Sequence, residues 1–344
     1  MIAPKNLGTS FAFIGWNPFQ LKHALSIAQR LPNATILIEK RKQHIYQFDE
    51  ALLTETGLPT VIWRRDNVRE LDGAFDVFVC QTPFSQMDDI RRSAVAMVQY
   101  GYAKSPHNYG AWRAKAALCL VYGPHADAQI RPWCPTAIVG PPHMDAWYDS
   151  AFHERARQKI GPLLDANKPT ILYAPTWGEL STLPQYIDAV LSLSDAYNVL
   201  LKMHHNTDLL SQTWRAKLLK ETTHLFGAND DLLSLFSVCD AVLSDYSGAI
   251  FDALYCERPV VLLHDQTTSR MGAKLDVNSL EYAERHRIGP VLESPALLRQ
   301  TLGDVLNGTV DFQRDNRAFV DELYLREPGA AQRAADVLQQ YFGE

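Results

Sequence analysis

Short apolar runs separated by helix-length segments constrain the fold of this chain more than any other feature. Most of the runs are unalternated, which is typical of strands buried on both faces of a parallel sheet. Helical periodicity between the runs, as in residues 18–31, predicts repeated strand–helix–strand units. The runs form an N-terminal set at residues 11–15, 34–39, 59–63, 75–80, 95–101, 118–123 and 136–140. A second set lies at residues 169–175, 198–204, 224–227, 240–245 and 258–263.

The two sets of runs predict two domains, because 344 residues exceed one average hydrophobic core. The stretch 144–169 begins polar and helical and ends in an Asn-Lys-Pro loop, which places the break within residues 145–168. We therefore expect Rossmann-like domains over residues 1–150 and 165–328, with a closing helix over residues 329–344 near the domain junction. Two such halves facing a central cleft make a GT-B-like α/β architecture.

The composition argues against several classes of function. A net charge of -6 and a pI near 6.0 do not favour nucleic-acid binding. No apolar run approaches the 18 residues of a membrane span, and the N-terminal apolar stretch lacks a signal-peptide cleavage site. The five cysteines form no C-x-x-C pair, and Cys80, Cys119 and Cys239 sit in apolar runs. Buried thiols in a cytoplasmic protein are therefore expected.

The segment from residue 241 to residue 263 carries the most informative chemistry. A strand ends at Ser244 and Asp245, and a small-residue turn, Ser247-Gly248, opens a helix. The unsatisfied N–H groups at a helix start attract anions, and glycine lets a phosphate approach the backbone. The alternative is that Asp245 and Ser247 only cap the helix.

That segment, SDYSGAIFDALYCERPVVLL (244–263), resembles the phosphate-binding signature of the CDP-glycerol glycerophosphotransferase family, the teichoic-acid polymerases and primases. Other segments resemble the family's motifs in the family's order. They are LYAPTWGE (172–179), LLKMHHNT (200–207), DDLLSLFSVCDAVLSDYS (230–247), RIGPVLES (287–294) and EPGAAQRAADVL (327–338). The resemblance covers roughly residues 95–340 and is strongest in the C-terminal half.

The resemblance implies a GT-B fold with an N-terminal acceptor domain and a C-terminal nucleotide-donor domain. It implies transfer of an alditol phosphate, such as glycerol phosphate, from a CDP-linked donor to a hydroxyl acceptor in teichoic-acid-like or capsular polymer synthesis. The histidine of the family's K-x-H strand end matches His204, which makes it the first catalytic candidate. The residues expected at the donor are Thr176, Lys202, Ser244, Asp245, Tyr246, Ser247 and Gly248.

One departure from the family concerns its W-H-G-T-P-x-K stretch, whose histidine is the expected base. The corresponding segment here is VQYGYAKSPHNYG (98–110), in which Tyr100 stands at the histidine and Lys104 falls one residue early. Tyrosine, with an ordinary pKa of about 10, is a poor base at neutral pH. His107 and His143 are therefore candidate substitutes for the base.

No motif in the sequence predicts a metal site or a bound cofactor. It contains no phosphate-loop, dinucleotide-binding, H-E-x-x-H or G-x-S-x-G signature. We expect a metal-independent reaction in which the nucleotide-activated donor is a substrate. The expected partners are that donor and a polymer or lipid-linked acceptor. The expected location is the cytoplasm, with peripheral contact at the inner face of the membrane as an option.

Two other functions stay open from the sequence. Gly248 also suits a nucleotide-sugar glycosyltransferase or an enzyme like UDP-N-acetylglucosamine 2-epimerase, whose helix start has a Ser-Gly pair. Tyr100 would suit a non-catalytic GT-B protein that binds a nucleotide but has lost the chemistry.

Overall fold

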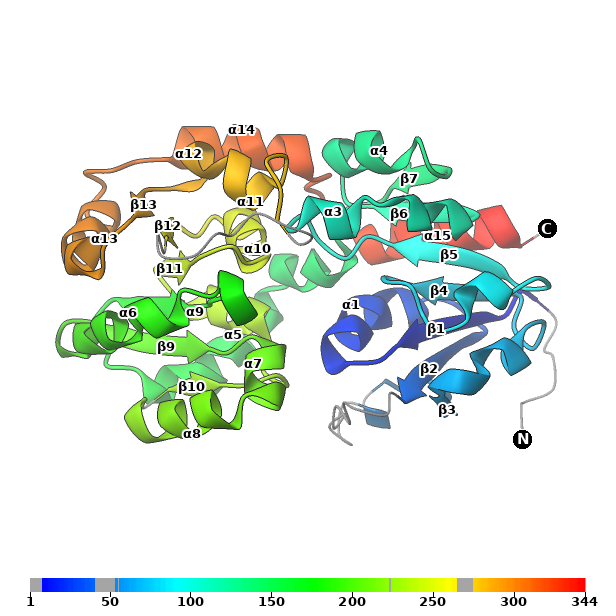
Figure 1. Cartoon of the computed structure of the whole chain (residues 1–344), viewed down its shortest axis with the longest axis horizontal. Coiled ribbons are helices and arrows are strands. Elements are labelled where there is room, and N and C mark those ends of the chain that lie inside the picture. Colours follow the sequence, from blue (N-terminus) through cyan, green and yellow to red (C-terminus); the bar gives the residue numbers. More distant parts are fainter. Residues whose placement is uncertain (1–7, 41–52, 55, 223, 265–274, 344) are drawn as a thin grey trace. The chain divides into compact units, whose positions relative to one another are not determined.

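The computed structural model describes residues 8–40, 53–54, 56–222, 224–264 and 275–343 (Figure 1). The chain divides into two compact units, each with its own sheet. Unit 1 comprises residues 1–100, 109–145 and 322–344, and unit 2 comprises residues 101–108 and 146–321. All strand pairs within the described ranges are parallel. The prediction of two parallel-sheet α/β domains is confirmed.

The division of the chain is less simple than two consecutive spans. The chain passes into unit 2 between Asp145 and Ala146, at the start of the stretch in which the sequence places the break. Residues 101–108 leave the N-terminal span to join unit 2, and the closing helix joins unit 1. Packing, which sequence position alone does not reveal, decides these memberships.

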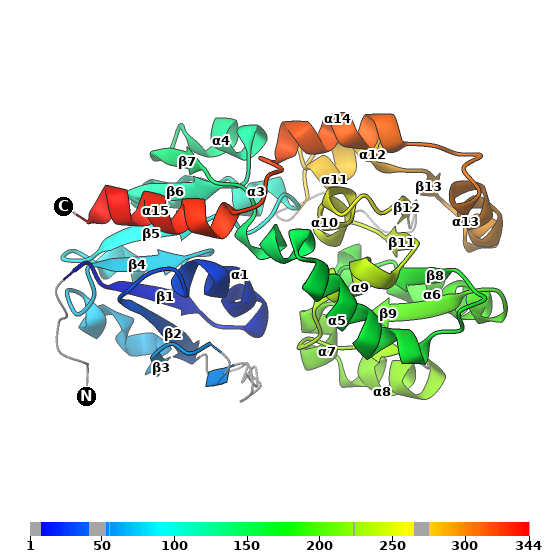
Figure 2. The same ribbon diagram turned by 180° about the vertical axis from the view of Figure 1, so that it is seen from behind.

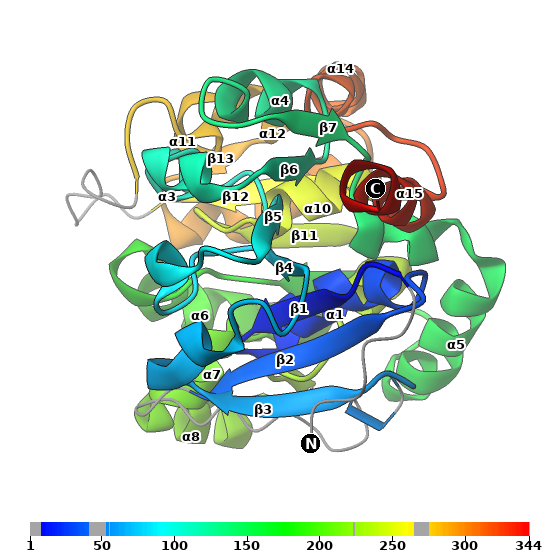
Figure 3. The same ribbon diagram turned by 90° about the vertical axis from the view of Figure 1, so that its right-hand side faces the viewer.

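The sheet of unit 1 has seven strands in the order β3-β2-β1-β4-β5-β6-β7 (Figure 3). Each of the seven predicted N-terminal runs overlaps one of them. The strands are β1 (Phe11–Gly15), β2 (Ala34–Lys40), β3 (Thr60–Arg64), β4 (Val77–Cys80), β5 (Ala94–Val98), β6 (Leu118–Val121) and β7 (Thr136–Ile138). The main helices of this unit are α1 (Pro18–Ala28), α4 (Pro124–Ile130) and α15 (Ala330–Phe342).

Helix α15 lies beside α1 on one face of this sheet (Figure 2). Its buried residues recur at alternating spacings of one and three positions and so line one side: Ala330, Ala331, Ala334, Ala335 and Leu338. Small side chains on that side allow close approach to the sheet.

The N-terminus of α15 is capped from a distant part of the sequence. One carboxylate oxygen of Asp145 accepts the N–H groups of Gly329 and Ala330, at 3.0 and 2.8 Å, and the other accepts that of Ala331 at 2.8 Å. These N–H groups have no partner inside the helix, so the carboxylate satisfies them and complements the helix dipole.

The sheet of unit 2 has six strands in the order β10-β9-β8-β11-β12-β13. The strands are β8 (Thr170–Tyr173), β9 (Asn198–Lys202), β10 (Leu225–Phe226), β11 (Ala241–Ser244), β12 (Val260–Leu263) and β13 (Val291–Leu292). The first five lie in the predicted runs, whereas the two-residue strand β13 was not predicted. The order is that of the dinucleotide-binding Rossmann sheet.

The helices of unit 2 pack around this sheet. They are α3 (Ser105–Asn108), α5 (Ser150–Ile160), α6 (Leu183–Leu191), α7 (His205–Leu210), α8 (Gln212–Glu221), α9 (Leu232–Val238), α10 (Ala249–Tyr255), α11 (Leu280–Ala283), α12 (Arg285–Ile288) and α13 (Leu298–Leu306). Helix α14 (Gln313–Leu323) ends just after the chain returns to unit 1.

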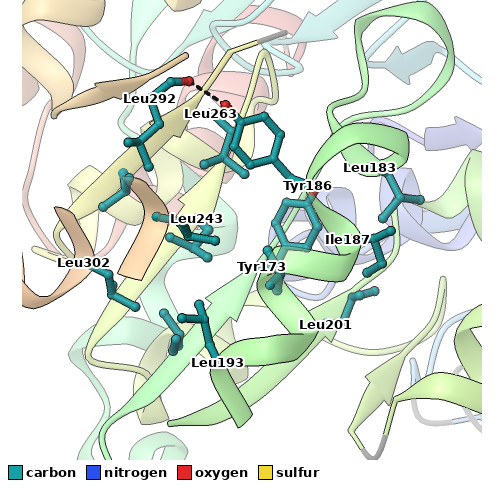
Figure 4. Packing of buried hydrophobic residues seen from close by; sticks show 14 of the residues in the cluster. Tyr173, Leu183, Tyr186, Ile187, Leu193, Leu201, Leu243, Leu263, Leu292 and Leu302 are labelled. Atoms are coloured by element: carbon teal, nitrogen blue, oxygen red, sulfur yellow. Dashed lines mark hydrogen bonds between the residues drawn. The ribbon is translucent and has the colours of Figure 1, made fainter. Parts of the chain in front are cut away.

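Helix α6 shows how the apolar pattern builds the core of unit 2 (Figure 4). Its buried residues, Leu183, Tyr186, Ile187 and Val190, follow helical spacing and pack in one cluster with strands β8 to β13. Each such side chain contributes roughly 1.5–3 kcal/mol when fully buried. The hydroxyl of Tyr186 donates to the carbonyls of His264 and Leu292, at 2.9 and 2.8 Å, so the ring is buried without an unsatisfied polar group.

All five cysteines are buried free thiols, as the sequence predicts. No helix in the described ranges is long and apolar enough to cross a bilayer.

Candidate functional site

The sheet of unit 2 changes its winding direction between β8 and β11, which are hydrogen-bonded neighbours. In open parallel sheets, ligands bind beyond the carboxyl ends of the strands at such a switch point. The loop after β8 contains Thr176, and the loop after β11 contains Asp245 to Gly248. The topology therefore brings together six of the seven residues that the sequence predicts at the donor, including Ser244 at the end of β11.

Asp245 connects the two loops through its buried carboxylate. One oxygen accepts the N–H of Thr176 at 2.8 Å, and the other accepts the N–H and hydroxyl of Thr182, at 2.9 and 3.1 Å. Burial raises the pKa of Asp245, although these donors and the charge of Lys104 oppose the rise. Both carboxylate oxygens thus have hydrogen-bond partners within the protein, and Asp245 holds together the loops that follow β8 and β11.

Ser244 and Tyr246 hold the same loop from either side of Asp245. The Ser244 hydroxyl donates to the carbonyl of Ala174 at 2.6 Å. The Tyr246 hydroxyl lies 2.5 Å from Nδ1 of His264, and the guanidinium of Arg285 lies 4.7 Å from the centre of the Tyr246 ring. Since these contacts are buried or half-buried, the loop has a fixed shape without a ligand.

Arg285 ties the strand ends to α11. Its guanidinium donates to the carbonyls of Leu263 at 3.0 Å, Glu281 at 3.3 Å and Asp245 at 3.4 Å. A buried guanidinium that serves several carbonyls acts as a clamp on the backbone.

Ser247 and Gly248 lead into α10, a helix of only seven residues. The Ser247 hydroxyl accepts the N–H of Ala249 at 3.3 Å, and the Ser247 carbonyl accepts that of Ile250 at 3.3 Å. Within the described ranges, the N–H groups of Ser247 and Gly248 have no protein acceptor. These two N–H groups are therefore available to an anion. Ser247 also caps the helix, which the sequence leaves as an alternative, because its hydroxyl accepts the N–H of Ala249, the first residue of α10.

Gly248 has ordinary helical backbone angles, with φ of -59°. A methyl group added at this position would meet only the side chain of Ala103, at 3.9 Å. The fold itself therefore does not require glycine here.

Lys202 and His204 lie where β9 leaves the sheet. The Lys202 ammonium donates to the carbonyls of Gly227 at 2.7 Å and Met203 at 3.1 Å, so it fastens β9 to the end of β10. His204 is half-buried at the N-terminus of α7, and its ring lies 4.1 Å from that of His205.

The hydrogen bonding of His204 indicates its tautomer. Its Nδ1 accepts the N–H of Asn206 at 3.2 Å, so the neutral ring carries its proton on Nε2. Burial, with the charges of His205, Lys104 and Lys202, lowers the pKa of His204 well below its ordinary value. At neutral pH His204 is therefore an uncharged side chain with one N–H available as a donor.

Lys104 lies close to these groups although the sequence did not identify it as a site residue. Its ammonium is 3.3 Å from the hydroxyl of Thr176, and its own N–H donates to Glu281 at 2.6 Å. Burial raises the pKa of Glu281 to about 7, against the lowering effect of that N–H and of the Lys104 charge. Lys104 thus stands among the titratable groups at the carboxyl edge of the sheet.

The two substitute bases lie in different units. His107 is exposed in α3, which belongs to unit 2. His143 belongs to unit 1, where its ring stacks on that of His23 with centres 3.8 Å apart. Tyr100 is also in unit 1, and the centre of its ring lies 5.5 Å from the centre of the Phe19 ring. Neither histidine is thereby assigned as the base.

Comparison with known proteins identifies the family. The model of the CDP-glycerol:poly(glycerophosphate) glycerophosphotransferase family matches residues 133–337, more than half of the chain. The chain belongs to this glycerophosphotransferase family. The match includes the loops of Thr176, His204 and Ser247, on which the sequence resemblance rests.

A curated relative from this family is the teichoic acid poly(glycerol phosphate) polymerase of Bacillus spizizenii. It is 27% identical over 117 residues, which cover 31% of this chain. The matched part is 28% of the length of that relative.

Solved structures with the same fold include the wall teichoic acid polymerase TagF, in a histidine-to-asparagine variant soaked with CDPG. It has 17% sequence identity and a TM-score of 0.67, covering 97% of this chain and 88% of that chain. A candidate UDP-N-acetylglucosamine 2-epimerase from Listeria monocytogenes has 14% identity and a TM-score of 0.66, covering 98% of this chain and 97% of that chain. These likenesses confirm the GT-B-like fold class.

The sequence did not single out Lys104 and Glu281, which lie beside the predicted donor residues. Lys104 lies in the segment compared with the family's W-H-G-T-P-x-K stretch, one residue before the position of the family's lysine. This near match is the signal that the sequence offered. Glu281 gives no signal, because a single glutamate between Leu280 and Tyr282 belongs to no recognisable motif. Among the described residues, no three His, Cys, Asp or Glu side chains gather as metal ligands would.

Proposed function

We propose that this protein transfers an alditol phosphate, such as glycerol phosphate, from a CDP-linked donor to a hydroxyl of a polymer or lipid-linked acceptor. The product would be a teichoic-acid-like or capsular polymer. The family match over residues 133–337 is the observation that carries this proposal. The pre-shaped loop at the switch point of unit 2 supports it, because that loop offers amides to an anion.

The reaction that fits is displacement at the β-phosphorus of the donor. The acceptor oxygen forms a bond to that phosphorus, the bond to the bridging oxygen breaks, and CMP leaves with that oxygen. The acceptor proton passes to a base. Negative charge grows on the bridging oxygen and the leaving phosphate, so preorganised N–H donors and cations stabilise the transition state most.

The donor would bind through its phosphates to the N–H groups of Ser247 and Gly248, with the Ser247 hydroxyl beside them. Thr176, Ser244 and Asp245 would hold the loops in place, and Lys202 would fix the strand end that carries His204. A charge-assisted hydrogen bond of this kind contributes about 1.5–3 kcal/mol. Ser247→Ala should therefore weaken donor binding roughly 10- to 150-fold, and unchanged binding would reduce Ser247 to a helix cap.

His204 would donate its Nε2–H to a phosphate oxygen. The acceptance of a backbone N–H by Nδ1 favours this role over that of a base, since the free nitrogen already bears the proton. His204→Ala should lower kcat by about 10²–10⁴ while the melting temperature stays near that of the parent. His204→Gln, which keeps a donor, should recover part of the loss; equal losses in both variants would contradict the donor role.

The base remains to be chosen between His107 and His143. Alanine variants of both residues, assayed for transfer and for donor hydrolysis, separate the two. The variant of the base should lose transfer but still bind the donor. If both variants transfer normally, neither histidine is the base.

A donor panel tests the proposed reaction itself. The protein is incubated with CDP-glycerol, other CDP-alditols and UDP-sugars, and released CMP, UMP and UDP are separated. CMP from a CDP-alditol supports the proposal. Release of UDP or an epimerised sugar would instead place the protein with the nucleotide-sugar enzymes, and binding without turnover would indicate a protein that has lost the chemistry.

We further propose that no metal or separate cofactor takes part and that contact with a membrane is peripheral. Turnover should survive dialysis against EDTA, and loss restored by one divalent cation would contradict metal independence. Flotation with acidic-lipid vesicles, with and without a lipid-linked acceptor, tests the membrane contact.

A further inference from the structure

The segment from residue 101 to residue 108 is held in unit 2 by several separate contacts. The Tyr102 ring is buried 5.9 Å from that of Phe251 in α10. The Ser105 hydroxyl donates to the carbonyl of Asn278 at 3.4 Å, and the Asn108 side chain donates to the carbonyl of Ala103. The segment thus has a defined conformation directly beside the Ser247-Gly248 turn, since Ala103 is the side chain nearest to Gly248.

Lys104 occupies the strained position of this segment. Its φ of 64° lies in the left-handed region, which non-glycine residues rarely adopt. The backbone is fixed on both sides: its N–H donates to Oε1 of Glu281 at 2.6 Å, and its carbonyl accepts the N–H groups of His107 and Asn108, at 2.8 and 3.1 Å. Such strain persists where the surroundings enforce it, and it clusters at functional positions.

The side chain of Lys104 reaches the switch point. Its ammonium contacts the Thr176 hydroxyl, and the N–H of Thr176 in turn binds Asp245. The Lys104 charge also acts on His204 and His205, whose pKa values it helps to lower after the larger effect of burial. The ammonium therefore stands between the loops that follow β8, β9 and β11.

Two other cations at the carboxyl edge of the sheet, Lys202 and Arg285, donate to backbone carbonyls. Lys202 donates to the carbonyls of Met203 and Gly227, and Arg285 donates to those of three residues. Lys104 directs its ammonium to a side-chain hydroxyl, that of Thr176 in the loop after β8. A cation beside the loop amides would compensate charge of a diphosphate that neutral N–H groups leave uncompensated.

Glu281 is placed to hold the Lys104 backbone. Its side chain is fully buried, and one carboxylate oxygen accepts the Lys104 N–H. The other oxygen, Oε2, has no hydrogen-bond partner among the described residues. Burial of a carboxyl group with only one hydrogen-bonded oxygen lowers the stability of the fold. The hydrogen bond from the Lys104 N–H is the contact that this burial provides.

We propose that Lys104 is the cation that contacts the diphosphate of the nucleotide-linked donor, and that Glu281 is the positioning residue that keeps Lys104 in its left-handed conformation. This inference rests on the proposed function for the identity of the donor, but not for the presence of a diphosphate. Lys104 would lie against non-bridging phosphate oxygens, while Glu281 would touch no ligand.

The experiment measures the affinity of the whole chain for CDP-glycerol, inorganic pyrophosphate and cytidine by calorimetry. Lys104→Met should weaken CDP-glycerol and pyrophosphate binding at least tenfold and leave cytidine binding unchanged. Lys168→Met is the matched control, because Lys168 lies in the loop before β8 at the opposite edge of the sheet and donates to the carbonyl of Ser194. Equal affinities of Lys104→Met and the parent for pyrophosphate would overturn the inference.

The role of Glu281 is tested by a pair of variants and a double variant. Glu281→Gln keeps an acceptor for the Lys104 N–H and should bind CDP-glycerol within about twofold of the parent. Glu281→Ala removes the acceptor and should weaken binding as Lys104→Met does. Combined with Lys104→Met, it should cost nothing further, because Glu281 acts through Lys104. An additive loss in the double variant, or a loss in Glu281→Gln equal to that in Glu281→Ala, would overturn the positioning role.

The outcomes separate this inference from the proposed function. If the parent binds pyrophosphate but does not release CMP from CDP-glycerol, the proposed function fails while the Lys104 comparison still decides the inference. If Glu281→Ala does not fold, the Glu281→Gln and Lys104→Met results carry the test. A parent that binds neither pyrophosphate nor any nucleotide diphosphate would overturn the inference outright.

Discussion

The buried carboxyl of Glu281 makes a prediction about stability and pH that needs no substrate. Its pKa is raised from an ordinary value of 4.5 to about 7, chiefly by burial. A raised folded-state pKa means that the native state holds the proton more tightly than the unfolded chain. The stability contributed by this group is complete below pH 4.5 and is lost as the pH rises through 7.

The magnitude follows from the pKa difference. Each pKa unit corresponds to about 1.4 kcal/mol, so the free energy of unfolding should fall by roughly 2–3 kcal/mol between pH 5 and pH 8 because of Glu281 alone. Glu281→Gln cannot ionise and should not show this loss. The stability of the variant relative to the parent should therefore improve by roughly 2–3 kcal/mol across that range.

Urea unfolding at pH 5, 6.5 and 8 measures the difference, and groups that titrate in both proteins cancel. Glu154→Gln is the control, because Glu154 is exposed in α5 and the side-chain hydrogen bond from Arg157 lowers its pKa. Its difference from the parent should be flat between pH 5 and pH 8. Parallel pH profiles for Glu281→Gln and the parent would refute the reasoning that Glu281 is buried with a raised pKa.

Three further predictions concern substitutions that the fold should tolerate to different degrees. Gly248→Ala should melt like the parent, since the new methyl group meets only the Ala103 side chain at 3.9 Å, but should bind the donor more weakly; a large drop in the calorimetric melt would contradict this. Gly123→Ala places a methyl group 2.1 Å from the carbonyl oxygen of Leu323, so urea unfolding should show a loss of at least about 2 kcal/mol. Asp145→Ala should cost about 1–2 kcal/mol by the loss of the α15 cap, and a stability equal to the parent's would mean that water replaces the carboxylate.

The strands were predictable because buried parallel strands leave a local signal. Every predicted apolar run overlaps a strand, and the Ser247-Gly248 turn follows β11 as its residues indicate. Strand β13 lies outside the predicted runs, since its two apolar residues stand between Pro290 and Glu293. The strand order and the switch point depend on pairing between distant segments, which no local pattern encodes.

The chemistry of the site was only partly predictable, since residue type does not reveal what each polar group contacts. Asp245 and Lys202 lie at the predicted strand ends, but their charged groups are largely committed to bonds within the protein. Their direct contact with a donor stays a prediction, as do the roles of His204, His107 and His143. The place of Lys104 beside Thr176 depends on packing, because residues 101–108 belong to unit 2.

The membership of residues 101–108 in unit 2 affects how the gene can be divided by recombination. Unit 2 is encoded by two separated stretches, and Lys104 lies upstream of residues 133–337, the region that the family model matches. A recombination event or a chimera that exchanged only the C-terminal half would inherit the Ser247 turn and Glu281 from one parent and the Lys104 segment from the other. The bond between the Lys104 N–H and Glu281 would then join residues of different ancestry, so the two stretches are expected to be exchangeable only as a pair.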